Sequence, residues 1–188
     1  SDLTIVDPEE DWIDDIAEQL DDGEETGPAV PENLKKIIEN MFRKKLSVEK
    51  VKTIMEKYNK PENLPILTAQ RVNQGVWMKL KPATKTLDLK MSKGIEKFIK
   101  SMIAIVKAIE ELSKMKGRIT DTKVKNDVKT ITKVLFEAVQ LGGQANQELA
   151  QRRRMQCKFD INAFDRVLFN SPQVQGVMLF ADRLHAKM

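Results

Sequence analysis

Two segments of the chain repeat apolar residues at alternating intervals of four and three positions. The first segment covers residues 91–112 and the second covers residues 124–149. This heptad spacing is typical of helices that pack side by side in a coiled coil. A short break at residues 116–118 separates them, and Asp121 follows as the expected N-cap of the second helix. We therefore predict an all-α protein, an elongated helical bundle around a long antiparallel coiled-coil hairpin.

The sequence outside the predicted hairpin, 83–158, divides into three regions. Residues 1–26 form an acidic arm, residues 27–82 interleave short apolar stripes with prolines, and residues 159–188 mix apolar clusters with Asn, Pro and Gly. We predict a short amphipathic helix in the arm, several short helices in 27–82, and a C-terminal tail that packs on the bundle. The arm residues that would share one helical face are Trp12, Ile13, Ile16 and Leu20.

The predicted hairpin carries more apolar residues than the seam between two helices can cover. The residues that widen its two stripes are Ile99, Ile103, Val106, Val134, Phe136 and Val139. The short N-terminal helices could cover them, and a second copy of the chain could do the same. Both alternatives stay open, and we predict self-association through these residues, with a dimer as the expected oligomer.

Small residues also mark the second long helix. Ala138, Gly142 and Ala145 would let a neighbouring helix approach closely at this point. The adjacent pair Gly142-Gly143 could instead mark a kink.

Charge is distributed unevenly along the chain. The first 25 positions hold 12 of the 28 acidic residues and no Lys or Arg. Residues 26–188 therefore carry 32 basic and 16 acidic side chains, a net charge of +16. Sustained positive charge favours a protein that binds a polyanion or takes part in an assembly. We also expect that the acidic arm can dock on the basic body, where it would compete with nucleic acid; the alternative is a solubilising, disordered tail.

The basic residues of the predicted hairpin form three groups that could contact phosphates. One brackets the turn, one ends the second helix, and one follows the first helix at intervals of three and four. The predicted nucleic-acid contacts are Lys114, Lys116 and Arg118; Arg152, Arg153 and Arg154; and Lys90, Lys93, Lys97 and Lys100. The alternative is a solvated flank of the coiled coil, since no base-stacking aromatic residues accompany these charges.

Catalytic motifs are missing from the sequence. The single histidine, His185, stands near the C-terminus, and no glycine-rich phosphate-binding motif is present. Cys157 is the only cysteine, so no cysteine-based zinc cluster can form. Its arginine neighbours could lower its pKa, but we expect a packed, unreactive thiol. We predict no catalytic residue, no metal, no cofactor and no enzyme activity.

The expected location is intracellular, either cytoplasmic or nuclear. No apolar run reaches the length of about 20 residues that a membrane-spanning helix requires, and we expect no contact with a membrane. The beginning of the chain also lacks the basic and apolar regions of a signal peptide.

Three groups of short motifs occur together in a characteristic order. They comprise residues 27–30 with 46–50, then 57–64 with 71–77, and last 146–154 with 180–184. The most specific parts are Pro61-Glu62-Asn63 and Gln151-Arg152-Arg153-Arg154. In this order they resemble the Gag-like first open reading frame of DIRS-type, tyrosine-recombinase retrotransposons, from about residue 27 to residue 188. Two motifs depart from that pattern: Leu64 stands where relatives often have cysteine, and Phe180-Ala181-Asp182-Arg183-Leu184 replaces Phe-Gly-Asp-Asp-Leu.

The resemblance implies a structural protein that self-associates and packages or binds RNA or DNA, or a derivative that a host genome has captured. No zinc knuckle is present, so the basic helical body would have to bind the nucleic acid. The alternative function is a helical protein-interaction scaffold without direct nucleic-acid binding.

Overall fold

The computed structural model describes residues 26–161 and 176–180. The predicted helix of the acidic arm, most of the C-terminal tail and His185 lie outside these ranges. The chain forms two compact units, Ser1–Leu46 and Ser47–Met188, and the boundary falls within the region that we predicted as one set of short helices.

The first unit contains helix α2, which spans Glu32–Arg43. Pro31 stands at its N-cap and Glu32 occupies the first turn, where an acidic side chain interacts favourably with the helix dipole. Arg43 occupies the last turn. The helix has a distinct apolar face, yet none of its residues is buried.

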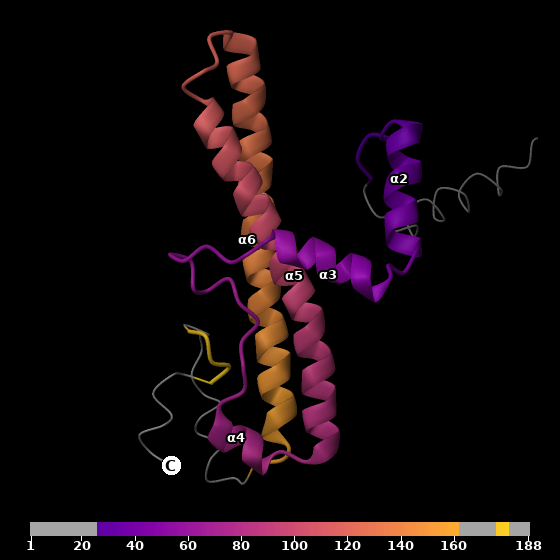
Figure 1. Ribbon diagram of the computed structural model, residues 1–188, viewed down its shortest axis with the longest axis vertical. Helices are drawn as coiled ribbons and strands as arrows, with labels where there is room; N and C mark the ends of the chain where they lie inside the picture. The colour runs from indigo at the N-terminus through magenta and orange to yellow at the C-terminus, as the bar shows by residue number, and fades with distance from the viewer. Residues whose placement is uncertain (1–25, 162–175, 181–188) are drawn as a thin grey trace, which may run out of the picture. The chain divides into compact units, whose positions relative to one another are not determined.

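The second unit contains helices α3 (Val48–Lys57), α4 (Gln74–Lys79), α5 (Pro82–Met115) and α6 (Thr122–Lys158) (Figure 1). The all-α prediction is confirmed, because the described ranges contain no strand beyond one isolated parallel bridge between Arg71 and Met178. Ser47 caps α3, since its hydroxyl oxygen accepts a hydrogen bond of 3.2 Å from the Lys50 N–H.

Helices α5 and α6 pack against each other as the predicted hairpin. They contain 34 and 37 residues, so each is about 50–55 Å long at 1.5 Å per residue. Pro82 begins α5, where its missing N–H removes no helical hydrogen bond. Asp121 caps α6 by accepting a hydrogen bond of 2.9 Å from the Val124 N–H.

The two adjacent glycines lie within a continuous α6. Gly142 is buried, and a Cβ atom there would overlap the sulfur of Met102 on α5, whereas Gly143 faces open space. The sequence allowed either a kink or a close approach of a neighbouring helix at this pair. The structure shows a close approach, at Gly142.

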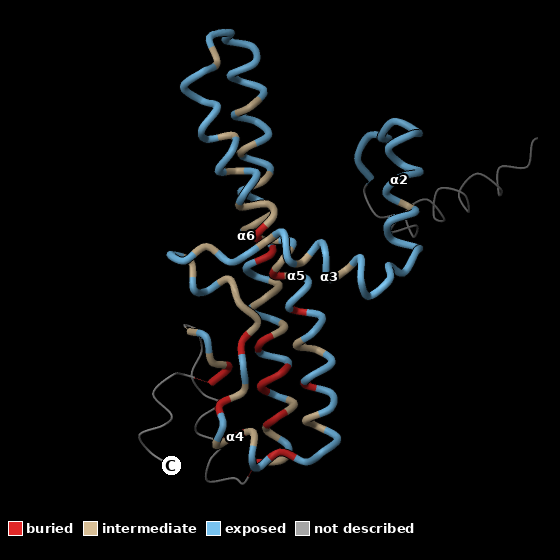
Figure 2. The backbone as a smooth tube through the Cα atoms, viewed as in Figure 1, coloured by how far each residue is buried: buried red, intermediate tan, exposed pale blue. Residues whose placement is uncertain are grey.

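The core of the second unit covers only one part of the hairpin (Figure 2). We call residues 82–103 and 142–158 the proximal half of the hairpin, and residues 104–115 and 122–141 its distal half. All the buried residues of α5 and α6 belong to the proximal half. Residues 104–141, all of which the structure describes, include no buried side chain. The segment that leads from α3 to α4 and residues 176–180 supply the cover on the proximal half.

Candidate functional surfaces of the hairpin

The second of the three consecutive arginines, Arg153, is enclosed in the proximal half and only 2% exposed. Its guanidinium donates two hydrogen bonds to the carboxylate of Asp88 on α5, from Nε to Oδ1 at 2.8 Å and from Nη2 to Oδ2 at 3.0 Å. Its Nη1 donates a third to the Gln70 carbonyl at 2.7 Å. This bidentate geometry is the one that makes an arginine–carboxylate pair strong and directional. Arg153 therefore joins α6 to α5 and to the segment before α4.

Arg154 is also 2% exposed and holds the C-terminal segment. Its Nε donates a hydrogen bond of 2.6 Å to the Leu179 carbonyl, and its guanidinium lies 5.8 Å from the centre of the Phe180 ring. Burial lowers the pKa of this guanidinium from its usual value. The positive charge is stabilised by a carbonyl dipole and an aromatic face in place of water.

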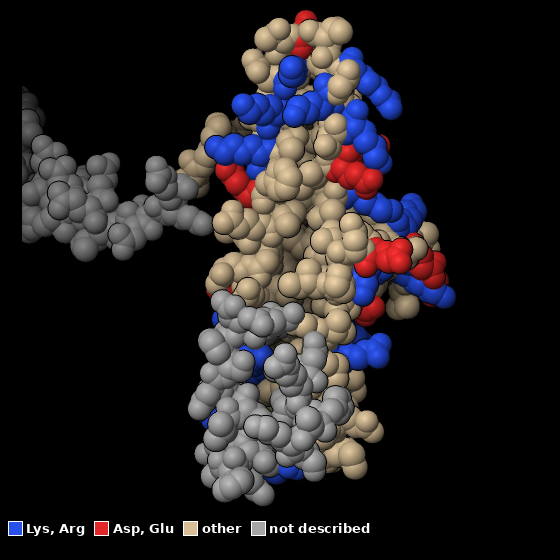
Figure 3. Space-filling view, turned by 90° about the vertical axis from the view of Figure 1, so that its left-hand side faces the viewer, with Lys and Arg blue, Asp and Glu red and all other residues tan. Residues whose placement is uncertain are grey.

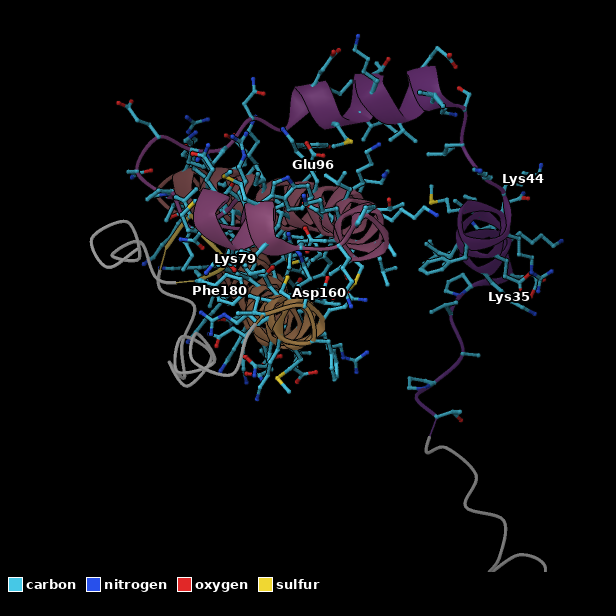
Figure 4. All side chains as sticks on the ribbon, turned by 90° about the horizontal axis from the view of Figure 1, so that it is seen from below. Lys35, Lys44, Lys79, Glu96, Asp160 and Phe180 are labelled. Carbon is cyan, nitrogen blue, oxygen red and sulfur yellow. The ribbon has the colours of Figure 1, made fainter. Side chains whose placement is uncertain are left out.

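Residues 176–180 are paired with the chain just before α4. The Arg71 N–H donates to the Val177 carbonyl at 3.2 Å, and the Leu179 N–H donates to the Arg71 carbonyl at 2.7 Å. Leu179 and Phe180 are fully buried against Val76, Leu80 and other core residues. Figure 4, a view along the hairpin from below, shows Phe180 beside Lys79 of α4, the helix whose Val76 belongs to the same buried cluster as Phe180. The predicted packing of the tail is thus observed for these residues.

The structure corrects our prediction for two of the three arginines. Arg153 and Arg154 cannot reach a phosphate while their guanidinium groups are enclosed, and only Arg152 is exposed. The heptad spacing of residues 124–149 does not predict this burial, because its continuation from Leu149 falls on position 152, which is exposed. The buried face instead runs through Ala150, Arg154 and Cys157, one position further along the chain.

Cys157 belongs to the same buried region and is fully enclosed. Burial raises the pKa of its thiol to about 12, and the nearby Asp88 carboxylate acts in the same direction. The thiolate that would act as a nucleophile is therefore scarce at neutral pH.

Two residues that we predicted for self-association are covered by the chain itself. Ile99 and Ile103 are 5% and 1% exposed, and they form a cluster with Ile95 against Tyr58, Leu67 and Ala69. The segment of the same chain between α3 and α4 therefore covers this part of the apolar stripe. Val106 and Val139 are partly exposed, while Val134 and Phe136 are 58% and 57% exposed. The last four stay available to a partner.

The lysine row on α5 is mostly directed to solvent. Lys90, Lys93 and Lys97 are exposed, and the Lys97 ammonium donates to the Lys93 carbonyl at 3.1 Å. Lys100 is only partly exposed, and its ammonium donates to the Tyr58 carbonyl at 2.7 Å. Lys100 therefore anchors the end of α3 to α5, and the first three lysines form the exposed part of the row.

The basic group at the turn is partly neutralised. Lys114 lies 2.8 Å from a carboxylate oxygen of both Glu110 and Glu111. Its hydrogen bonds to these carboxylates, first to Glu110, raise the pKa of the Lys114 ammonium to about 12. Lys116 and Arg118 are exposed.

The distal half contains a groove between α5, the turn and α6. Its volume is about 710 Å³, and its apolar lining includes Ile109, Leu112, Val128 and Phe136. Lysine side chains lie along the same groove, and Figure 3 shows Lys and Arg gathered on the upper, distal part of the hairpin. The groove is thus an apolar surface with a basic border.

Residues 26–161 and 176–180 contain no group of three or more His, Cys, Asp or Glu side chains that could hold a metal ion. None of the described helices is long and apolar enough to cross a membrane.

Comparison with known protein families gives a match over most of the chain. The model of a family described as a domain of unknown function (DUF8747) matches residues 28–172. Neither the curated proteins nor the solved structures give a significant match.

Proposed function

The chain belongs to the DUF8747 family, whose description assigns no activity, and we propose that it is a Gag-like structural protein. It self-associates through the distal half of the hairpin and binds nucleic acid through exposed lysines of the helical body. The main support for this proposal is that the proximal half of the hairpin is covered by other segments, whereas the distal half contains no buried side chain.

The exposed apolar area of the distal half supports self-association. Val124, Ile131, Val134, Phe136 and Leu141 of α6 are between 47% and 72% exposed. An apolar surface of this kind is costly to hydrate and marks a contact site. A helical hairpin that leaves half of its length uncovered is suited to pack against another copy or another segment.

The lysine row supports the nucleic-acid part of the proposal. Lys90, Lys93 and Lys97 repeat at intervals of three and four on α5 and are exposed together. Binding by such a row neutralises phosphates without reading bases, so the affinity should fall steeply with salt. The resemblance to the Gag-like proteins of DIRS-type retrotransposons, or to a host-captured derivative, agrees with this role.

A scaffold that binds only proteins is the second candidate. It is favoured by the internal use of basic groups, because Arg153, Arg154, Lys100 and Lys114 all contact partners within the chain. Fewer basic side chains are therefore available to bind phosphate groups than the number in the sequence suggests.

Binding of the full chain to single-stranded RNA and to duplex DNA at two salt concentrations tests the nucleic-acid role. The test variant replaces Lys90, Lys93 and Lys97 by Ala together. Its control replaces Lys35, Lys36 and Lys44, which are exposed in the first unit and remove the same charge. We expect the test variant to lose more affinity than the control and to show a smaller salt dependence. Equal losses would contradict the lysine row, and no binding at low salt would favour the scaffold.

Light scattering over a concentration series tests self-association. The full chain should increase in mean mass with concentration, and a chain that stays monomeric at high micromolar concentration would refute an assembly role. Phe136→Asp adds a charge to the exposed apolar surface and should weaken association, whereas Thr130→Asp adds the same charge at an exposed polar position of α6.

A further inference from the structure

We propose that the distal groove receives residues 9–20 of a second copy of the chain, so that copies join arm to groove. This inference rests on the proposed function and specifies the contact through which the protein assembles.

The groove combines an apolar floor with a cationic border. Ile109 and Leu112 of α5 and Val128 and Phe136 of α6 contribute apolar surface, and all four remain at least partly exposed. The cationic residues that line it are Lys116, Lys125, Lys129 and Lys133. Glu137 is the one acidic residue of the lining, and it lies 3.7 Å from Lys133. An occupant that fits this surface has an apolar face and acidic flanks.

The acidic arm has this chemistry in its sequence. Positions 1–25 contain 12 acidic residues and no Lys or Arg. Trp12, Ile13, Ile16 and Leu20 fall at the spacing of one helical face, and acidic residues occupy three of the five positions between them. Docking of an amphipathic helix in an apolar groove uses anchors at this spacing.

The lengths also agree. Residues 9–20 would extend about 18 Å as a helix, and the α6 border of the groove, from Lys125 to Gln140, extends about 23 Å. The predicted helix can therefore lie along the groove without passing either end.

Charge argues against the simplest alternative, in which two grooves face each other. A two-fold contact would bring the four lysines of one copy near the same lysines of the other. Like charges at close range in a contact oppose association, whereas the acidic arm would neutralise them. An arm-to-groove contact is heterologous, so it can continue from copy to copy and build a chain of subunits.

Mixing two defective variants of the full chain tests the proposal. Ile16→Asp impairs the arm and leaves the groove intact, while Phe136→Asp impairs the groove and leaves the arm intact. Phe136 is 57% exposed, so its replacement should not unfold the hairpin, and thermal unfolding by circular dichroism checks this for both variants. Ala17→Asp, next to the apolar face of the arm, is the matched control for the added charge.

We expect each variant alone to associate at least about tenfold more weakly than the wild type, while Ala17→Asp associates normally. An equimolar mixture should form a one-to-one complex and stop there, because one working arm meets one working groove. Light scattering or sedimentation measures the mass.

Several outcomes would overturn the inference. If Ile16→Asp associates like the wild type, the arm is not the occupant, although the protein still assembles and the proposed function survives. If the wild type associates but the mixture yields no complex, the groove does not take an arm from another copy. A wild type that stays monomeric refutes both the inference and the assembly role.

Charge reversal provides an independent test. Lys125→Glu with Lys129→Glu should abolish association with a wild-type arm. Adding Glu10→Lys and Asp15→Lys to the arm of that same chain should restore it, because the signs are complementary again. Failure of this rescue, in a chain whose thermal unfolding is unchanged, counts against the arm-to-groove contact.

Discussion

The two halves of the helical hairpin have the same heptad spacing but different surroundings. In the proximal half, Ile95, Ile99 and Ile103 are buried under the segment between α3 and α4. In the distal half, Ile131, Val134 and Phe136 are more than half exposed. A heptad repeat therefore specifies which faces of two helices meet, and it leaves open what covers the rest of their surface.

The difference assigns different roles to similar residues. The buried apolar and basic residues of the proximal half hold the fold together, since Arg153 and Arg154 fix the covering segments in place. Apolar and basic residues of the distal half contribute little burial within the chain. Substitutions of buried residues in the proximal half should therefore affect mainly stability, and substitutions of exposed apolar residues in the distal half should affect mainly association.

The largest expected effect comes from adjacent arginines. Arg153→Ala leaves the buried Asp88 carboxylate without its partner, which should cost about 3–5 kcal/mol of unfolding free energy. Arg152→Ala, at the exposed neighbouring position, should change it by less than about 0.5 kcal/mol. Urea unfolding of both variants measures the difference. Similar values would show that Arg153 is not buried in solution.

Isoleucines from the two halves give the next comparison. Ile103→Ala removes a side chain that is 1% exposed and should cost about 2–5 kcal/mol. Ile131→Ala removes one that is 51% exposed, so its cost at concentrations where the chain is monomeric should be clearly smaller. The comparison fails if Ile131→Ala destabilises the monomer as much as Ile103→Ala does.

The two adjacent glycines should respond in opposite directions. Gly143→Ala meets open space and should stabilise α6 by about 0.5–1 kcal/mol through its better helix propensity. Gly142→Ala forces the Met102 side chain to move, which offsets that gain or reverses it. Thermal unfolding should rank Gly143→Ala above the wild type, with Gly142→Ala clearly below Gly143→Ala. Equal gains from both would mean that α5 and α6 do not approach closely here.

The smallest effect is the loss of stability at acid pH that involves Asp160, which lies just after α6 and contacts the start of α5. Asp160 accepts a hydrogen bond of 2.9 Å from the Lys81 N–H at the start of α5. The Thr84 hydroxyl and then this N–H hold the pKa of the Asp160 carboxyl below its usual value of 3.8. A lowered folded-state pKa contributes stability that is complete above about 3.8 and is lost as the pH falls through the folded-state value.

Asp160→Asn should therefore lower the free energy of unfolding at pH 7, and this difference from the wild type should shrink below about pH 4. Urea unfolding at a series of pH values measures it. A difference that stays constant down to pH 2.5 would contradict the assigned role of the carboxylate.

Local signals in the sequence predicted much of the fold. The hairpin follows from its heptads, and the start of α6 follows from Asp121. These features depend on residues within the same helix, so they can be inferred without knowledge of distant segments. The size of Gly142 allowed either a close approach or a kink, and Met102 on α5 decides between them.

The candidate surfaces were harder to predict. Arg152, Arg153 and Arg154 have the same local charge and helix propensity, and yet only the first is exposed. Likewise, Ile103 and Val134 both widen the apolar stripe, but only Ile103 has a covering segment.

The sequence alone determined an all-α chain with a long hairpin, an acidic first segment and a basic remainder. The tertiary structure decided which of the basic and apolar side chains belong to the interior. The buried charges have partners that are distant in the sequence: Arg153 is hydrogen-bonded to Asp88, 65 positions away, and Arg154 to Leu179, 25 positions away. Whether a charge is buried depends on such distant partners, and they become neighbours only when the chain folds.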